Sequence, residues 1–438
     1  MLERDWGDIT ARLDRQVGRW HPSADEAGIA ELMRMYAVPG ISIAARRGAD
    51  SWAAGYGTTV AGGSTEVAPR TVFQACSISK HVAAFGVLRL VDQGVLALDE
   101  DVNAYLRSWR VPEAGGWPAV ITVRQLLGHT AGLSYNWFRG FHSGASHPTL
   151  RQVLAGEEPA NTPPVRVSLL PGSRFRYSGS HYAVVQQLLI DVTGVGFAEL
   201  MHTLVLEPLG MTDSSYDQSF PHGRGELVAT GHQVDGIPVS GRWRVLPEAA
   251  GAGLWTTPGD LARLGAEIAR AAAGEPALLS GDLAGQLLTV QVPGGDYGLG
   301  TQVDGERFGH VGGNIGYGCW LFTWRESGTT VAVMANSGGC NELLDAILAA
   351  AERRYAAPGA GGTPVAGTYL LREGYPLLVD VAGEQVTLTA AGQPPVRLIP
   401  LPTGQFLVPG LDCELTFGEG TVELRQEGRV DTAELSGS

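Results

Sequence analysis

Lysine is almost absent from this sequence. Of its 31 lysine and arginine residues, Lys80 is the single lysine. A biased genome composition can replace lysine with arginine at most surface positions, where either cation serves. Arginine cannot serve where a side chain must give up its proton, because a guanidinium stays charged. We therefore expect Lys80 to be retained for proton-transfer chemistry.

Cysteine is also scarce, and metal-ligand spacings are missing. The chain has 4 cysteines (Cys76, Cys319, Cys340 and Cys413), which are scattered and form no C-x-x-C pair. This argues against a disulfide framework and against structural zinc. The 10 histidines include no H-E-x-x-H spacing, so no metal site is expected. Cys76 is interpreted as a small core residue.

Long apolar runs and a positive net charge are missing as well. No stretch approaches the about 18–20 apolar residues that a membrane-spanning helix needs, and residues 1–6 do not open a secretory signal. The net charge is −14, and an acidic surface repels nucleic-acid phosphates. We expect no nucleic-acid partner, no membrane span and a cytoplasmic location.

The distribution of strand and helix patterns predicts an α/β fold for most of the chain. Hydrophobic residues make up 44% of the chain and charged residues 17%, as in a globular protein with a packed core. Strand patterns lie at both ends of the first 355 residues, and helix patterns lie between them. This favours an α/β sandwich with a central antiparallel sheet and a helical insert. Strands are predicted at 40–47, 51–57, 307–311, 317–324 and 329–335, and helices at 1–35, 78–94, 123–127 (capped by Thr122), 181–192 (capped by Ser180) and 341–354.

The C-terminal part of the chain has a different pattern. Residues 356–364 are rich in glycine, proline and alanine and are interpreted as a linker. Residues 365–438 hold no helix pattern, but short strand segments separated by turn residues, which predicts a small antiparallel barrel or meander. The predicted domains are therefore 1–355, a linker at 356–364, and 365–438.

Ser77 and Lys80 form the sharpest chemical feature. They lie three residues apart at the start of a predicted helix, so both side chains can leave the same face. A serine hydroxyl is a poor nucleophile unless a base takes its proton. A lysine amine is such a base when neutral, and burial favours the neutral form. The alternative interpretation of this spacing is a capping serine and a solvated lysine.

Two further segments contain residues suited to the same chemistry. Tyr177 precedes a predicted helix, and its phenol can shuttle a proton between nucleophile and leaving group. His310 lies on a predicted strand that continues into Gly312, Gly313 and Asn314. A glycine-rich strand exposes amide N–H groups to a substrate. Taken alone, Tyr177 would be a half-buried aromatic residue and His310 a structural histidine.

These features together resemble the serine β-lactamase and penicillin-binding-protein superfamily, in its class C-like branch of esterases and D-aminopeptidases. The resemblance covers about residues 25–345. It rests on the order and spacing of FQACSISK (73–80), LLGHTAGL (126–133), PGSRFRYS (171–178), EPLGMTD (207–213), YGLG (297–300) and GHVGG (309–313). The C-terminal segment resembles the lipocalin-like barrels appended to some members, which suggests a role at the substrate entrance or in a homo-oligomer.

The resemblance implies a role for each matching residue. Ser77 would be the nucleophile, Lys80 its general base, and Tyr177 the acid/base that serves the leaving group and the water. The N–H groups of Ser77 and Gly313 would form the oxyanion hole. His310 would be a catalytic-site residue where many relatives have lysine or tryptophan, and His129 would be structural. Substrate contacts are expected at Gly179, Gly312 and Asn314.

Two departures from the family pattern bear on the substrate. Gly179 stands where the tyrosine motif usually ends in asparagine, and His310 stands where lactamases and carboxypeptidases have lysine. Imidazole is largely neutral at pH 7 and holds a carboxylate less firmly than an ammonium does. We therefore predict a serine hydrolase of small esters or D-amino-acid amides and peptides, working without metal or organic cofactor. The alternatives are a D,D-carboxypeptidase or weak β-lactamase, and a non-catalytic scaffold.

Overall fold

The computed structural model describes residues 29–355, 363–371, 374–383, 385–400, 405–408, 413–426 and 429–436. The chain divides into two compact units, of which one includes Met33–Leu344 and the other Asp345–Ser438. The predicted boundary at 356–364 stays a prediction, since residues 356–362 lie outside the described residues. Of the predicted N-terminal helix, the described part forms α2 (Ile29–Met35), and the rest lies outside the described residues.

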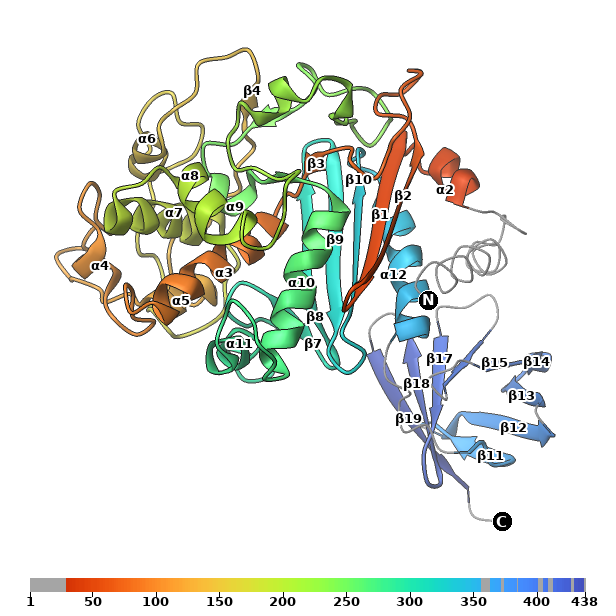
Figure 1. Ribbon diagram of the computed structural model, residues 1–438. Coiled ribbons are helices and arrows are strands. Elements are labelled where there is room, and N and C mark those ends of the chain that lie inside the picture. The colour runs from red at the N-terminus through yellow and green to blue at the C-terminus, as the bar shows by residue number, and fades with distance from the viewer. Residues whose placement is uncertain are drawn as a thin grey trace. The chain divides into compact units, whose positions relative to one another are not determined.

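The first unit is built on a six-stranded antiparallel sheet that joins distant parts of the chain (Figure 1). The N-terminal hairpin lies against the last strand of the unit, with Ile43 opposite Val333. This confirms the predicted sheet of N- and C-terminal pieces. The order is β2 (Asp50–Gly57), β1 (Gly40–Arg47), β10 (Thr329–Ala335), β9 (Tyr317–Trp324), β8 (Arg307–Asn314) and β7 (Gln302–Asp304).

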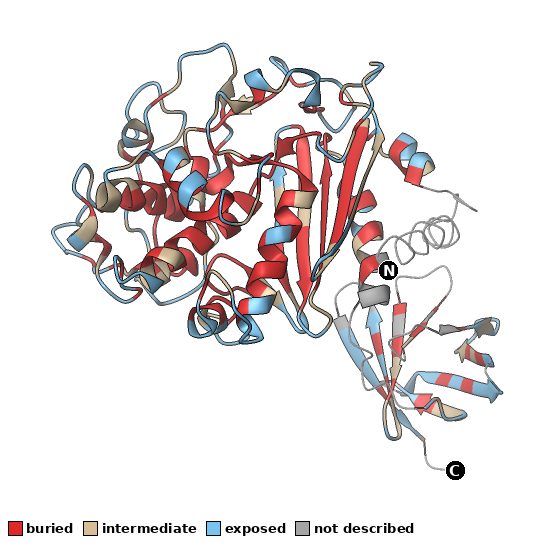
Figure 2. Ribbon diagram, in the orientation of Figure 1, coloured by how far each residue is buried: buried red, intermediate tan, exposed pale blue. Residues whose placement is uncertain are grey.

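Helix α10 (Pro258–Ala272) covers one face of this sheet (Figure 1). Gly265 allows the close contact, because a Cβ there would lie 2.6 Å from Thr330 Cγ2 and would also collide with the Thr323 hydroxyl. Those two threonines bond to each other across β9 and β10, with 2.9 Å between their hydroxyl oxygens. The strands β1, β9 and β10 are buried along most of their length (Figure 2).

Helices are the main regular elements of the segment between β2 and β7, as predicted. Thr122 forms a complete capping box with Gln125, which explains why so short a helix begins where the sequence predicts. The predicted cap at Ser180 is wrong: Ser178 caps that helix, because its hydroxyl accepts the N–H of Ser180 at 3.2 Å. The helices are α3 (Ile78–Asp92), α4 (Val102–Tyr105), α5 (Val123–Leu127), α6 (Leu150–Ala155), α7 (Gly179–Thr193), α8 (Phe197–Met201), the π-helical η2 (His202–Leu206), the 3₁₀ turns η3 (Phe220–Gly223) and η4 (Gly225–Leu227), α9 (Ala249–Ala252), α10 and α11 (Gly281–Leu287).

Short strands and one final helix complete this part of the chain. The short strands pair as β3 (Phe73–Gln74) with β6 (Trp255–Thr256), and β4 (Phe141–His142) with β5 (Arg244–Val245). Helix α12 (Asn341–Tyr355) follows β10, close to its predicted bounds. Within the described residues, no single helix is long and apolar enough to cross a membrane. The cytoplasmic location stays a prediction.

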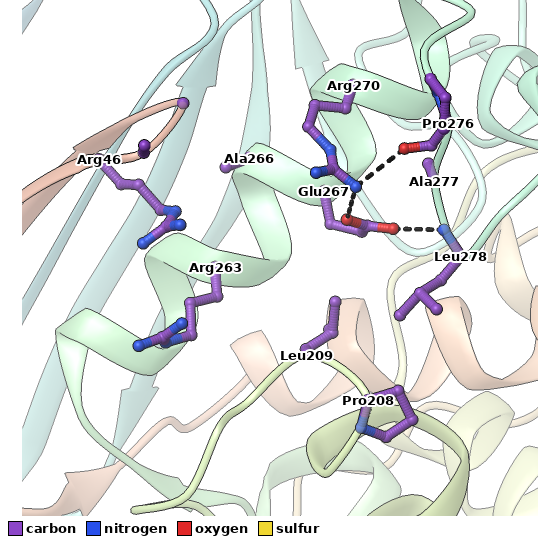
Figure 3. Close-up of a pocket in the computed structure, with 12 residues that line it drawn as sticks. Arg46, Pro208, Leu209, Arg263, Ala266, Glu267, Arg270, Pro276, Ala277 and Leu278 are labelled. Atoms are coloured by element: carbon purple, nitrogen blue, oxygen red, sulfur yellow. Dashed lines mark hydrogen bonds and ion pairs between the residues drawn. The ribbon is translucent and has the colours of Figure 1, made fainter.

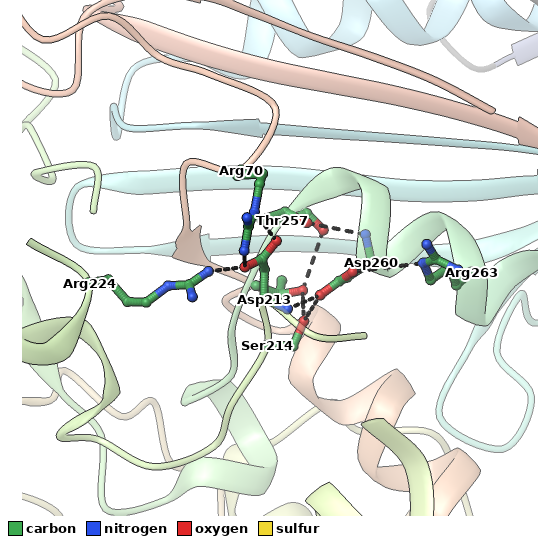
Figure 4. Close-up of polar contacts among 8 residues, drawn as sticks. Arg70, Asp213, Ser214, Arg224, Thr257, Asp260 and Arg263 are labelled. Atoms are coloured by element: carbon green, nitrogen blue, oxygen red, sulfur yellow. Dashed lines mark hydrogen bonds and ion pairs between the residues drawn. The ribbon is translucent and has the colours of Figure 1, made fainter. Parts of the chain in front are cut away.

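A buried carboxylate network ties two loops to the start of α10 (Figure 4). Arg70 donates two hydrogen bonds to Asp213, at 2.9 and 2.8 Å, and Arg224 donates a third. The hydrogen bond from Arg70 is the main reason that the pKa of Asp213 lies below its ordinary value. Asp260 in α10 accepts the N–H of Asp213 at 2.9 Å and the hydroxyl of Ser214 at 2.7 Å. Charged hydrogen bonds of this kind hold the connections in place.

The second unit contains a curled all-β sheet, which confirms the predicted barrel or meander. The chain passes from one edge strand to the other through Leu398 alone, so the sheet must curl to bring its edges together. Alternation places Leu377 and Val379 in its core while Leu378 is 41% exposed. The strand order is β14 (Val396–Arg397), β13 (Gln385–Ala390), β12 (Pro376–Ala382), β11 (Gly367–Leu370), β19 (Arg429–Leu435), β18 (Thr421–Gln426), β17 (Cys413–Phe417), β16 (Phe406–Leu407) and β15 (Ile399–Pro400).

Candidate active site

Ser77 lies at the junction of β3 and α3. Cys76, the residue before it, has a φ of 50°, in the left-handed region that residues other than glycine rarely adopt. The turn makes Ser77 the N-cap of α3, but its side chain makes no capping hydrogen bond. The hydroxyl is therefore available to another partner. Strained backbone next to such a hydroxyl is common at functional sites.

Lys80 is that partner. Its side chain is buried, and Nζ lies 3.0 Å from Ser77 Oγ and 2.7 Å from the carbonyl oxygen of Gly251. Because a carbonyl only accepts, Lys80 donates one N–H to Gly251. A neutral amine held in this way can accept the Ser77 hydroxyl proton across the 3.0 Å contact. The three-residue spacing thus brings the two side chains together at the N-terminal end of α3.

The ring of Tyr177 lies over the Lys80 amine. Lys80 Nζ is 5.0 Å from the centroid of the Tyr177 ring, and the tyrosine is half-buried. Its ring also packs against His129, with 4.4 Å between ring centroids, and against His310, at 6.1 Å. Tyr177 therefore belongs to the same cluster as Ser77 and Lys80, although it lies about a hundred residues away in sequence.

Two buried histidines support Tyr177 through the residue that follows it. His129 Nδ1 accepts the N–H of Ser178 at 3.4 Å, and His181 Nδ1 donates to the Ser178 carbonyl at 3.2 Å. The two Nδ1 atoms lie 3.3 Å apart, and because Nδ1 of His129 accepts, the His129 ring must be neutral. Burial accordingly lowers the pKa of His181 to about 4 and that of His129 well below its usual range. These contacts agree with the structural role predicted for His129.

His310 packs beside Tyr177 but is not among the residues that line the cleft. It is 2% exposed, and its Nδ1 lies 2.5 Å from the Val311 carbonyl oxygen, to which it must donate. Its Nε2 then accepts the hydroxyl of Tyr297 at 2.9 Å. Burial, assisted by the charge of Lys80, lowers the pKa of His310 to about 3. His310 is thus neutral at pH 7, and both ring nitrogens have protein partners.

Strand β8 passes close beside the Ser77 turn. A Cβ on Gly312 would lie 2.7 Å from Cys319 Sγ, 2.8 Å from the Ala75 carbonyl oxygen and 2.8 Å from Cys76 Cβ. Only glycine allows this approach without displacing the strand. Gly313, the next residue, lines the same cleft as Ser77. The two residues whose N–H groups are the predicted oxyanion donors, Ser77 and Gly313, therefore line one cleft, and the role of those groups stays a prediction.

The cleft between these elements is narrow, with a volume of about 20 Å³. It includes every predicted site residue except His310 and Gly312. Among the described residues that line it, Lys80 carries the only charge-bearing side chain. The lining residues are Ser77, Lys80, Tyr135, Asn136, Trp137, Phe138, Tyr177, Ser178, Gly179, Gly251, Ala252, Gly313 and Asn314.

The cleft has an aromatic rim that was not among the predicted site residues. Tyr135 and Trp137 are 61% and 52% exposed at its edge, whereas Phe138 is buried. A Cβ on Gly179 would lie 2.6 Å from the Phe138 ring, so the phenyl group occupies the space that a side chain at 179 would need. The sequence contains an indication of this rim, because Tyr135, Trp137 and Phe138 place three aromatic residues within four positions, and such an apolar cluster at a surface often marks a binding site. The Gly251 carbonyl carried no sequence signal.

Comparisons with known proteins agree with this architecture. Residues 26–353 match the family described as Beta-lactamase. The esterase EstB of Burkholderia gladioli is 33% identical over 202 residues, which are 43% of this chain and 49% of the esterase. The match thus spans about half the length of that relative.

Two solved structures share the fold. The octameric penicillin-binding protein homologue from Pyrococcus abyssi has a TM-score of 0.62 at 24% identity, covering 93% of this chain and 98% of that chain. The D-amino acid amidase from Ochrobactrum anthropi SV3, complexed with L-phenylalanine, has a TM-score of 0.61 at 21% identity and covers 80% and 98%. Because the family match extends over far more than half of the sequence, this chain belongs to the Beta-lactamase family.

Proposed function

We propose that the chain is a serine hydrolase that forms an acyl-enzyme at Ser77 and acts on small esters or on D-amino-acid amides and peptides. The observation that carries this proposal is the buried contact between Lys80 Nζ and Ser77 Oγ, at 3.0 Å. A scaffold protein gains nothing from a lysine buried against a serine. The similarity to an esterase and to the fold of a D-amino acid amidase supports the same reading.

Acylation follows from the positions of these groups. Lys80 takes the hydroxyl proton as Ser77 Oγ attacks the substrate carbonyl carbon, and the carbonyl oxygen becomes an oxyanion. The N–H groups of Ser77 and Gly313 stabilise that oxyanion, and losing one such donor typically costs ~10²–10³ in kcat. The tetrahedral intermediate then breaks its bond to the leaving group. The departing alcohol or amine receives the proton from Lys80 through Tyr177, and the acyl group remains as an ester on Ser77.

Deacylation reverses the same steps with water. Water replaces the departed group, and its oxygen attacks the acyl carbon. Tyr177 takes a proton from this water and passes it to Lys80. The second tetrahedral intermediate expels Ser77 Oγ, which regains its proton from Lys80. The carboxylic acid product then leaves, and the protein returns to its starting state without a cofactor.

The charge of the cleft indicates whether a substrate with a carboxylate would bind. Lys80 carries the only charge-bearing side chain among the described lining residues, and it is engaged by Ser77 and Gly251. His310 is neutral at pH 7, because its pKa is lowered to about 3. A substrate carboxylate would find no free cation there. We therefore place esters and amides without a carboxylate at this position ahead of D,D-peptides and β-lactams.

The rim bears on substrate shape. The cleft is narrow, and we expect the parts of a substrate away from the reacting carbonyl group to lie along the exposed rings of Tyr135 and Trp137. Aromatic rings give large apolar contact area to acyl or leaving groups. We expect p-nitrophenyl and phenylalanine derivatives to be better substrates than their alanine counterparts.

The experiment is labelling with a fluorophosphonate probe followed by peptide mapping, with Ser77→Ala as the control. The expected adduct lies on Ser77, and an adduct elsewhere would overturn the assignment. Initial rates on p-nitrophenyl acetate, D-phenylalanine amide, nitrocefin and a D-Ala-D-Ala peptide then rank the substrates. Fast nitrocefin or D-Ala-D-Ala turnover with little esterase or amidase activity would favour the lactamase or carboxypeptidase alternative.

We also propose that the C-terminal sheet is a lipocalin-like barrel that supports a homo-oligomer. Its curled antiparallel strands and the octameric state of the Pyrococcus homologue motivate the proposal. Light scattering on the full chain tests it: a mass above that of one chain, 46.1 kDa, is expected. A monomer at micromolar concentration would contradict it.

A further inference from the structure

A second and larger cavity lies in the first unit, beside helix α10 (Figure 3). Its volume is about 720 Å³, within the range of small-molecule sites. It shares no lining residue with the Ser77 cleft. Its wall is formed by Arg46, Gly48, Ala49, Pro208, Leu209, Arg263, Ala266, Glu267, Arg270, Pro276, Ala277 and Leu278.

Arginine side chains gather in this cavity although the chain is acidic overall. Three of the lining residues are arginines, and Glu267 is the only acidic one. Arg270 donates to Glu267 at 2.8 Å and to the Pro276 carbonyl at 3.0 Å, so it is held against the wall. Arg46 and Arg263 are left to face the cavity, and Figure 3 shows both side chains extending into the same space beside α10.

These two guanidiniums are poorly neutralised by the protein. Arg263 has one distant partner, Asp260, with 3.9 Å between Nε and Oδ1, and that carboxylate already accepts two hydrogen bonds. Among the described residues, no hydrogen bond or ion pair is found for the side chain of Arg46. Its pKa is lowered by partial burial and by the neighbouring charges of Arg263 and Arg270. Holding like charges together in this way costs stability unless an anion neutralises them.

The remaining wall is apolar. Pro208, Leu209 and Leu278 line the side of the cavity near Arg270, and Ala266 and Ala277 add small apolar surface. A purely inorganic anion would leave this surface unused. Guanidinium groups bind phosphate and carboxylate oxygens in paired hydrogen bonds, and two of them match a double negative charge.

We propose that this cavity binds a small molecule in which a dianionic group, a phosphate monoester or a pair of carboxylates, is joined to an apolar portion. Arg46 and Arg263 hold the anionic group, and Leu209 and Leu278 contact the apolar portion. This site is separate from the Ser77 cleft, and the proposal does not depend on Ser77 being the nucleophile.

Calorimetric titration of the full chain tests the proposal with phenyl phosphate, phthalate and phenol as probes. Phenyl phosphate or phthalate should bind and phenol should not, and the tighter of the two anions identifies the anionic group. Arg46→Gln and Arg263→Gln should each weaken binding about tenfold or more, since each removes a charge-assisted hydrogen bond. Arg110→Gln, at an exposed arginine outside both cavities, should bind as the parent chain does.

A second variant keeps the test decisive if an arginine variant fails to fold. Ala49→Trp, at an exposed turn position on the rim, obstructs the cavity while leaving every charge in place, and it should abolish binding. Unchanged binding in Ala49→Trp, or in a folded Arg46→Gln chain, would overturn the proposal. So would phenol binding as tightly as the anions, or no binding of either anion to the parent chain.

Discussion

Replacing Gly312 with alanine should separate β8 from the Ser77 turn. The added methyl group would lie 2.7 Å from Cys319 Sγ, against 3.4 Å for an ordinary contact, and 2.8 Å from the Ala75 carbonyl oxygen and from Cys76 Cβ. The strand must therefore move by about 0.6–0.7 Å away from the turn, because two of the three contacts are with Ala75 and Cys76, which directly precede Ser77. Gly313, whose N–H is the proposed second oxyanion donor, moves with it.

Two magnitudes follow from this displacement. Overpacking of a well-packed site costs about 1–3 kcal/mol of folding free energy. A misplaced oxyanion donor costs up to about 10²–10³ in kcat, which is about 2.7–4 kcal/mol of transition-state stabilisation. We expect Gly312→Ala to lower the melting temperature modestly and kcat on p-nitrophenyl acetate severely, with KM little changed.

The control and the refuting outcomes are specific. Gly285→Ala, at an exposed position of α11 where a Cβ meets no atom within 4 Å, should match or exceed the parent stability and keep the parent kcat. If Gly312→Ala were destabilised but kept full kcat, the close contact would be right and the oxyanion assignment wrong. If it lost neither stability nor kcat, the reasoning from the close contact itself would be refuted.

The remaining predictions concern the base, the cleft wall and the buried carboxylate. Lys80→Arg should abolish acylation of Ser77 although it keeps the charge, since a guanidinium cannot accept the proton; fluorophosphonate labelling at the parent rate would contradict this. Gly179→Asn should cost about 1–3 kcal/mol because its Cβ meets the Phe138 ring at 2.6 Å, and adding Phe138→Ala should recover part of the loss; strictly additive unfolding energies would refute the clash. Asp213→Asn should destabilise the chain by about 1–3 kcal/mol at pH 7. The folded pKa of Asp213 is depressed, so its contribution is present above the unfolded value and is lost as pH falls. The difference from the parent chain in denaturant titrations should therefore narrow below about pH 4, and a difference that grows on acidification would count against the network.

Local features of this protein were predictable from sequence because they depend on neighbouring residues. The cap at Thr122 depends on Gln125, three residues away, and the pairing of Ser77 with Lys80 depends on one turn of helix. The error at Ser180 has a tertiary cause. Ser178 is selected as the cap because its hydroxyl also bonds to the Ser134 carbonyl and accepts the N–H of Asn136. Those partners lie more than 40 residues away.

The sequence alone determined which side chains are the candidates for nucleophilic chemistry, because a solitary lysine one helical turn from a serine is a local feature. Tertiary structure decided what surrounds them. The carbonyl that holds Lys80 comes from Gly251, 171 positions away, and the ring that occupies the space beside Gly179 comes from Phe138. It likewise decided that His310 is buried, is neutral at pH 7 and does not line the cleft. Burial and contacts between distant segments set charge state and access, and these arise only when the chain is packed.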